Sequence, residues 1–151
     1  MRVALLALGA LTLSACSYAD SSSPVVTIAS VTVETIPEAA AGGAPWDPAS
    51  APDIYIEMQD ALGRVYLSST STDVASFPAV TASAPTEVSN IDREYFFFAV
   101  EQDEDIPSRE WAWIGATDAF SFAELDQERP STLRLTNEDE AFCLVLTLNW
   151  Q

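Results

Sequence analysis

Alternation between apolar and polar positions recurs along the chain and predicts short β-strands. Val25–Ile36 (VVTIASVTVETI) is rich in Val, Ile and Thr and ends at Pro37, which is typical of a strand. The stretch that follows, Glu38–Pro52, is dominated by Ala, Gly and Pro and therefore predicts a loop. Tyr95–Val100 (YFFFAV) is short and densely apolar, as expected of a buried central strand.

Further runs have the composition of strands, and turn residues separate them. These runs are Asp53–Gln59, Gly63–Ser69, Val74–Val88, Trp111–Thr117, Thr132–Asn137 and Ala141–Trp150. The first two are joined by DAL, which predicts a hairpin, and the last two flank the turn residues EDE. Only Phe122–Glu128 has helical character, and it is short. About eight short strands with frequent turn signals predict an all-β fold, an antiparallel β-sandwich over residues 25–151.

The first residues show a different pattern, a short apolar segment behind a positive charge. Arg2 precedes the apolar run Val3–Leu13 (VALLALGALTL), which is much shorter than the about 20 residues that a membrane-spanning helix needs. This arrangement predicts a secretory signal peptide over residues 1–15. The segment ends in LSAC, which resembles the lipobox of bacterial lipoproteins at every position. An ordinary signal peptide with a Cys at this point by chance is the alternative.

The lipobox resemblance implies cleavage before Cys16 and lipid on that residue, so that the chain would be anchored in a membrane of the cell envelope. Ser17 follows the Cys in place of the Asp that resembles an inner-membrane retention signal, which favours the outer membrane. Residues 16–24 would then form the lipidated Cys and a flexible, polar tether. With Cys16 acylated, Cys143 would have no disulfide partner, and we expect a buried, small apolar residue there.

The charge of the chain excludes several classes of partner and enzyme. Its 151 residues, enough for one domain, include 23 acidic residues and 6 Arg, with neither Lys nor His. Loss of Arg2 with the signal peptide would leave 5 Arg against the same 23 acids, a formal charge of −18. Such a chain is not expected to bind nucleic acid, or anionic lipid unaided. Without His or Lys, no Ser-His-Asp or Schiff-base chemistry is expected. The chain also has no evident residues beyond the sandwich from which the substrate cleft of a glycosidase could be built.

Two acidic stretches border predicted strands. WDPASAPDIY, at 46–55, places Asp47 and Asp53 six residues apart before one strand, and EQDEDIPSRE, at 101–110, follows the apolar run YFFFAV. Ca²⁺ takes six to eight oxygen ligands, so a site gathers carboxylates from loops that converge in space. Carboxylates two residues apart on an extended backbone point the same way. The two stretches could therefore supply the two halves of one calcium site, or they could be solvated faces of a very acidic protein.

These residues resemble the C2 domain family. WDPASAPDIYIEM resembles its first calcium loop, and YFFFAVEQDEDIPSREWAWIG resembles its third. The resemblance implies an eight-stranded antiparallel β-sandwich that binds Ca²⁺ at one end and docks there on phospholipid or protein. By position, the implied calcium ligands are Asp47, Asp53, Asp103, Asp105 and Glu110. The strand-to-Asp103 spacing is one residue longer than the usual pattern, so Glu101 and Asp103 are an alternative pair.

Two functional hypotheses follow from these observations. In the first, a lipid-anchored, C2-like module binds Ca²⁺ through the two acidic loops, either to stabilise the domain or to contact a lipid or protein partner. In the second, the chain is a metal-free β-sandwich lipoprotein with a structural or envelope-assembly role. Trp46 and Trp111, beside the acidic loops, would either contact a membrane or partner, or cover the ends of the core.

Overall fold

The computed structural model describes residues 24–40, 42–46, 50–82, 85–102 and 111–151. Within these ranges, strands dominate and one short 3₁₀ turn, η1 (Phe122–Leu125), is present. No helix of the described ranges is long and apolar enough to cross a membrane. The strands are β1 (Val26–Thr35), β2 (Ile54–Asp60), β3 (Val65–Ser71), β4 (Ala79–Ala82), β5 (Thr86–Val88), β6 (Glu94–Glu101), β7 (Ala112–Ala116), β8 (Phe120–Ser121), β9 (Thr132–Thr136) and β10 (Cys143–Trp150).

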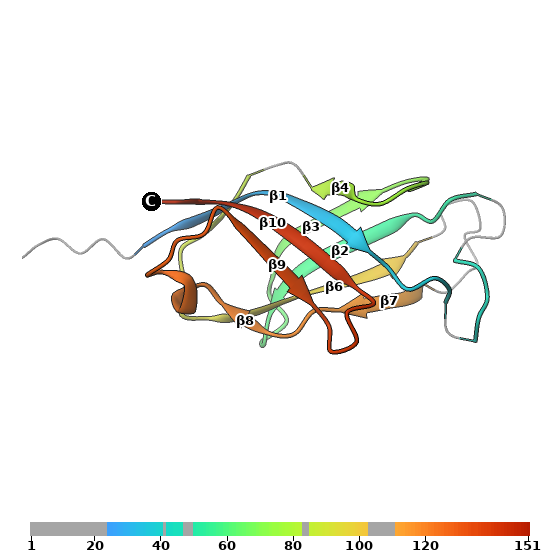
Figure 1. Ribbon diagram of the computed structural model, residues 1–151. Coiled ribbons are helices and arrows are strands. Elements are labelled where there is room, and N and C mark those ends of the chain that lie inside the picture. Colours follow the sequence, from blue (N-terminus) through green and yellow to red (C-terminus); the bar gives the residue numbers. More distant parts are fainter. Residues whose placement is uncertain (1–23, 41, 47–49, 83–84, 103–110) are drawn as a thin grey trace, which may run out of the picture.

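The strands form two antiparallel sheets that pack face to face (Figure 1). The first sheet has the order β4-β1-β10-β9, and β5 also pairs with β1. The second has the order β3-β2-β6-β7, and β8 pairs with β6. This arrangement confirms the predicted all-β antiparallel sandwich.

The core lies between the sheets and follows the alternation of each strand. In β1 the inward residues are Val26 and Ile28, and then Val31 and Val33, all with no exposed surface. Ile28 and Val31 are three positions apart, which breaks the alternation of every second residue, because the register of β1 against β10 shifts between Ile28 and Ser30. A β-bulge of this kind inserts one residue and returns the apolar positions to the core face.

The predicted central strand is confirmed as β6, which pairs with β2 and β7. Its inward residues include Tyr95, Phe97 and Ala99, none of which has exposed surface. On the neighbouring β7, Gly115 faces Phe142, which precedes β10 in the opposite sheet. A Cβ atom built on Gly115 would lie 2.9 Å from the Cβ atom of Phe142, so the two sheets approach closely at this glycine.

The structure differs from the predicted elements in three places. The predicted strand Val74–Val88 is two strands, β4 and β5, which pair with different parts of β1. Pro85 lies between them, and proline cannot donate the backbone hydrogen bond that a continuous strand needs. The two-residue strand β8 was not predicted, and the helical run Phe122–Glu128 contains only the turn η1. Both predicted hairpins, β2–β3 and β9–β10, are confirmed.

Candidate functional site

Asp53 is the one predicted calcium ligand that the described residues include. The other four, Asp47, Asp103, Asp105 and Glu110, lie outside the described residues, as does Cys16. Among the described residues, no group of three or more His, Cys, Asp or Glu side chains is placed to hold a metal ion. The complete set of five ligands therefore stays a prediction, and the structure bears on it through the strands that flank the two acidic stretches.

The two acidic stretches begin from neighbouring strands at one end of the sandwich. Asp53 directly precedes β2, and Gln102 directly follows β6. The backbone N–H of Gln102 donates to the backbone carbonyl of Asp53 at 2.9 Å. This bond continues the β2–β6 ladder, in which Ile54 is paired with Glu101. The chain therefore enters β2 from the first stretch and leaves β6 into the second at the same point of the sheet.

A third connection, the one between β3 and β4, also reaches this end. The backbone N–H of Asp73 donates to the Asp53 carboxylate at 2.7 Å, and the N–H of Val74 donates to the Pro52 carbonyl at 3.0 Å. Asp73 has a positive φ of 51°. The bond from Asp73 fixes the direction of the Asp53 side chain. The sequence gives no sign of this contact, because Asp73 stands alone between Thr72 and Val74, far along the chain from Asp53.

Glu101, the alternative ligand, ends β6 with its side chain fully buried. It has the same strand parity as Tyr95, Phe97 and Ala99, so it lies on the inward face of β6. Burial of a carboxylate is costly unless other groups compensate for its charge. Glu101 therefore belongs to the base of this end of the sandwich, below the point where the second acidic stretch leaves the sheet.

The two candidate contact residues differ in exposure. Trp46 is only 7% exposed, it belongs to the core, and its indole N–H donates to the Pro37 carbonyl at 2.7 Å. The sequence leaves two roles open for Trp46, contact with a membrane or partner and cover of the core. The burial of its indole at the end of the core agrees with the second of these roles. Trp111 is 59% exposed, and its ring lies 5.8 Å from the ring of Tyr55, centroid to centroid. Of the two, Trp111 alone presents most of its ring to solvent.

Cys143 is buried with no exposed surface, as predicted for a small apolar residue. Its thiol donates to the Glu34 carboxylate at 3.1 Å, and the same carboxylate oxygen accepts from Arg134 at 2.9 Å. Burial, together with the neighbouring negative charge of Glu34, raises the pKa of Cys143 to about 11. The thiol therefore stays protonated near neutral pH, and little of the nucleophilic thiolate is present.

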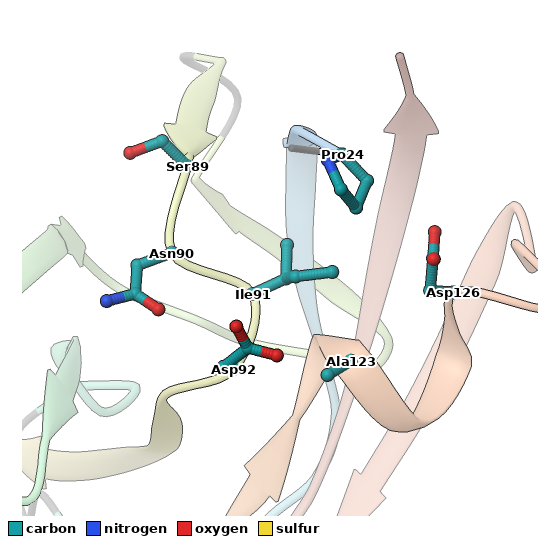
Figure 2. Close-up of a pocket in the computed structure, with 7 residues that line it drawn as sticks. All are labelled: Pro24, Ser89, Asn90, Ile91, Asp92, Ala123 and Asp126. Carbon is teal, nitrogen blue, oxygen red and sulfur yellow. The ribbon is translucent and has the colours of Figure 1, made fainter. Parts of the chain in front are cut away.

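A hollow of about 550 Å³ opens at the other end of the sandwich, where β1 begins (Figure 2). It lies between the connection from β5 to β6 and the turn η1. Two carboxylates, from Asp92 and Asp126, belong to its rim, and Ile91 and Ala123 form part of its lining. The backbone bond from the Ala123 N–H to the Ile91 carbonyl, 2.9 Å long, joins these two segments. The hollow is thus remote from Asp53, at the point where Pro24 leads into the domain.

The fold is similar to that of a solved structure of extended synaptotagmin 2 that comprises its SMP domain and two C2 domains. The similarity has a TM-score of 0.57 at 11% sequence identity, and it covers 85% of this chain and 27% of that one. The chain therefore spans about a quarter of the length of the structure it resembles. The likeness confirms the predicted C2-like β-sandwich. No protein-family model matches the chain, and no curated protein matches it.

Proposed function

We propose that this chain is a lipid-anchored envelope protein whose C2-like domain binds Ca²⁺ through the acidic loops at one end of the sandwich. The bound ion would stabilise the domain or let it contact a phospholipid or protein partner. The observation that carries the proposal is the backbone bond between Asp53 and Gln102, which joins the bases of the two acidic stretches. The lipid anchor rests on the lipobox resemblance at LSAC, residues 13–16.

Among the described residues at this end, Asp53 has the chemistry of a calcium ligand. Asp53 supplies carboxylate oxygens, which are the ligands that Ca²⁺ prefers. The hydrogen bond from the Asp73 N–H engages one oxygen of Asp53 and orients the carboxylate before any ion arrives. Pairing of β2 with β6 holds the end of the first acidic stretch beside the start of the second. This pairing lowers the conformational entropy that the two stretches would lose on binding an ion. When bound, Ca²⁺ supplies positive charge at an end that otherwise repels anionic groups.

Addition of Ca²⁺ is expected to raise the unfolding temperature of the full chain, purified in a non-ionic detergent, relative to EDTA. Binding to the folded state alone adds about 2.7 kcal/mol at a hundredfold excess of ligand over Kd. The shift should be larger than with Mg²⁺, since Mg²⁺ demands a stricter geometry and gives up its water reluctantly. Differential scanning calorimetry at fixed high NaCl measures it.

Asp53→Asn should remove most of this shift, because the neutral amide is a weaker ligand for Ca²⁺. Asp118→Asn is the matched control, an exposed aspartate that lies two residues past the end of β7, and it should keep the shift. Equal unfolding temperatures in Ca²⁺ and EDTA for the parent chain would contradict the calcium proposal and favour the metal-free sandwich with a structural role.

Cys16→Ser is expected to move the protein from the membrane fraction to the soluble fraction and to abolish incorporation of labelled palmitate. The serine hydroxyl cannot form the thioether on which lipoprotein anchoring depends. Cys143→Ala is the control, because Cys143 is buried in the sandwich, and it should leave both measurements unchanged. Palmitate labelling that persists in Cys16→Ser would disprove the assignment of the anchor.

A further inference from the structure

The outer face of the second sheet carries a continuous group of aromatic side chains, which we call the aromatic face. It consists of Tyr55 on β2, Phe98 on β6, Trp111 just before β7, and Trp113 on β7. Ring centroids of successive neighbours are 5.8 Å apart for Tyr55 and Trp111, 6.4 Å for Tyr55 and Phe98, and 5.9 Å for Phe98 and Trp113. Since inward positions of these strands fill the core, the aromatic face is additional to the core and points to solvent.

The exposure of the aromatic face is unusual for a structural role. Trp111 is 59% exposed and Trp113 is 58% exposed, and they are among the five exposed large apolar side chains of the described residues. The other three, Leu62, Val65 and Val80, are neither aromatic nor part of this group. Contiguous exposed aromatic surface that persists on a folded domain marks a site of interaction.

A carboxylate lies within the aromatic face. Glu57, also on the outer side of β2, is paired across the strands with Phe98. Its two carboxylate oxygens accept hydrogen bonds from the Tyr55 hydroxyl and the Gln59 amide, which hold the carboxylate in place beside the rings. Glu57 is 9% exposed, neither of these donors carries a charge, and β2, β6 and β7 contain no Arg and no Lys.

The charge of this surface decides among the occupants that would cover it. The faces of aromatic rings carry negative electrostatic potential and attract cations within about 6 Å of the ring centre. Glu57 adds a carboxyl group beside the rings, and the whole chain has a formal charge of −17 before any processing. A second copy of the chain would bring like charges together, and anionic lipid would be repelled. A cationic partner is complementary both to the rings and to the carboxylate.

We propose that the aromatic face binds an Arg-bearing segment of a partner protein, with the guanidinium stacked on the rings and its charge directed at Glu57. Arg is favoured over Lys because its planar, weakly hydrated guanidinium stacks on aromatic faces. This interaction needs neither the calcium site nor the lipid anchor, so it is independent of the proposed function.

The test is a titration of the full chain, in a non-ionic detergent with EDTA, with a synthetic peptide of alternating Arg and Ser. The NaCl concentration is kept at about 0.15 M, so that weak surface attractions are screened. Isothermal titration calorimetry is expected to show binding of this peptide, and Trp113→Ala should weaken it about tenfold, the usual range for loss of a desolvated cation–π contact. Trp113→Phe, which keeps an aromatic face, should retain an intermediate affinity and guards against a folding defect in Trp113→Ala.

Two controls separate the aromatic face from general attraction to an acidic protein. Leu62→Ala removes an exposed apolar side chain from the β2–β3 turn, outside the aromatic face, and should leave the affinity unchanged. A peptide with citrulline in place of Arg has the same shape without the charge, and it should not bind. Equal affinity of the Arg peptide for the parent chain and Trp113→Ala would overturn the proposal, as would equal binding of the citrulline peptide.

Other occupants of the face give different results. Sedimentation that shows a dimer of the parent chain and a monomer of Trp113→Ala would assign the face to a second copy and overturn the proposal. Reconstitution into phosphatidylcholine vesicles that shifts the tryptophan emission to the blue in the parent chain, but not in Trp113→Ala, would assign it to the bilayer and overturn it likewise. The calcium experiment has none of these readouts, so the failure of one proposal is distinguishable from the failure of the other.

Discussion

Phe142→Ala is expected to lower the free energy of unfolding by about 3–5 kcal/mol, the range for removal of a fully buried aromatic side chain. Phe142 has no exposed surface, and its ring fills the space between the sheets opposite Gly115. Because Gly115 has no side chain, few atoms are available to occupy the cavity that the alanine would leave. Denaturation in urea at fixed high NaCl measures the change, with the exposed Leu62→Ala as a control that should change stability by less than about 0.5 kcal/mol.

Gly115→Ala tests the close approach from the other side and is expected to cost about 1–3 kcal/mol, as overpacked cores do. Its new methyl group would lie 2.9 Å from the Cβ atom and 3.1 Å from the Cγ atom of Phe142. When it is combined with Phe142→Ala, the close contacts with the Cγ and Cδ1 atoms disappear and only the contact with the Cβ atom remains, so the double variant should lose less stability than the two single changes together. Additive losses would contradict this contact between the sheets.

Asp60→Asn is expected to lower the unfolding temperature by roughly 5–10 °C, because it removes the charge from a buried hydrogen-bonded carboxylate. Asp60 ends β2 and is 1% exposed, and Arg93 forms an ion pair with it. Its carboxylate also accepts from the Leu62 N–H at 2.8 Å, the Arg64 N–H at 3.0 Å and the Tyr66 hydroxyl at 3.0 Å. One side chain thereby joins the β2–β3 hairpin to the segment that leads into β6.

The pH dependence of Asp60→Asn gives a second readout of the same network. Burial alone would raise the pKa of Asp60, but the hydrogen bonds from Arg64, Arg93, Tyr66 and Leu62 outweigh it and hold the pKa well below its usual range. A carboxylate whose pKa is lowered by folding stabilises the folded state at pH values above its unfolded-state pKa, about 3.9. This stabilisation is lost as the pH falls from about 3.9 toward the folded-state pKa. The advantage of the parent chain over Asp60→Asn should therefore be complete at pH 5 and shrink progressively as the pH falls toward 2.

Asp126→Asn is the control for this network, since Asp126 forms a solvent-exposed pair with Arg129 at 3.0 Å. Exposed ion pairs contribute little, so this variant should unfold close to the parent chain. Taking the difference between parent and variant at each pH cancels the relief of repulsion among the other acidic residues. A difference for Asp60→Asn that stays constant from pH 5 to pH 2 would contradict the role of the ionised carboxylate.

Local patterns in the sequence predict most of the strands because each strand must bury every second residue. β1, β2, β6 and β10 therefore stand out, and so do the hairpins with short turns. The contact from Asp73 to Asp53 and the convergence of Asp60 with Arg93 are different, because they join residues 20 and 33 positions apart. Such contacts depend on how the strands pair in space, and no local pattern records that pairing.

In the candidate site, too, local sequence patterns predict some features, and others depend on how the strands pair in space. The spacing of acidic residues around Asp53 indicates where the chain would gather carboxylates, and the fold places the base of the first acidic stretch against that of the second. The inward direction of Glu101 and the outward direction of Trp113 follow from strand register. A bulge in β7, where the register shifts between Ala99 and Val100 of β6, sets the direction of Trp113. Hydrophobicity alone predicts both Trp113 and Phe98 as core residues, whereas both lie on the outer side.

The direction of β1 has a consequence for a molecule held by its amino-terminal end. β1 begins beside the hollow at Pro24 and ends near the loops that lead to Asp53, at the opposite end of the sandwich (Figure 1). Its ten residues advance about 3.3 Å each, so the two ends stand about 30 Å apart. A lipid on Cys16 would attach the chain to its bilayer on the side of Pro24, and the acidic loops begin at the opposite end of the domain. The reach of the acidic loops from that bilayer would therefore be set by the length of the domain together with that of the tether.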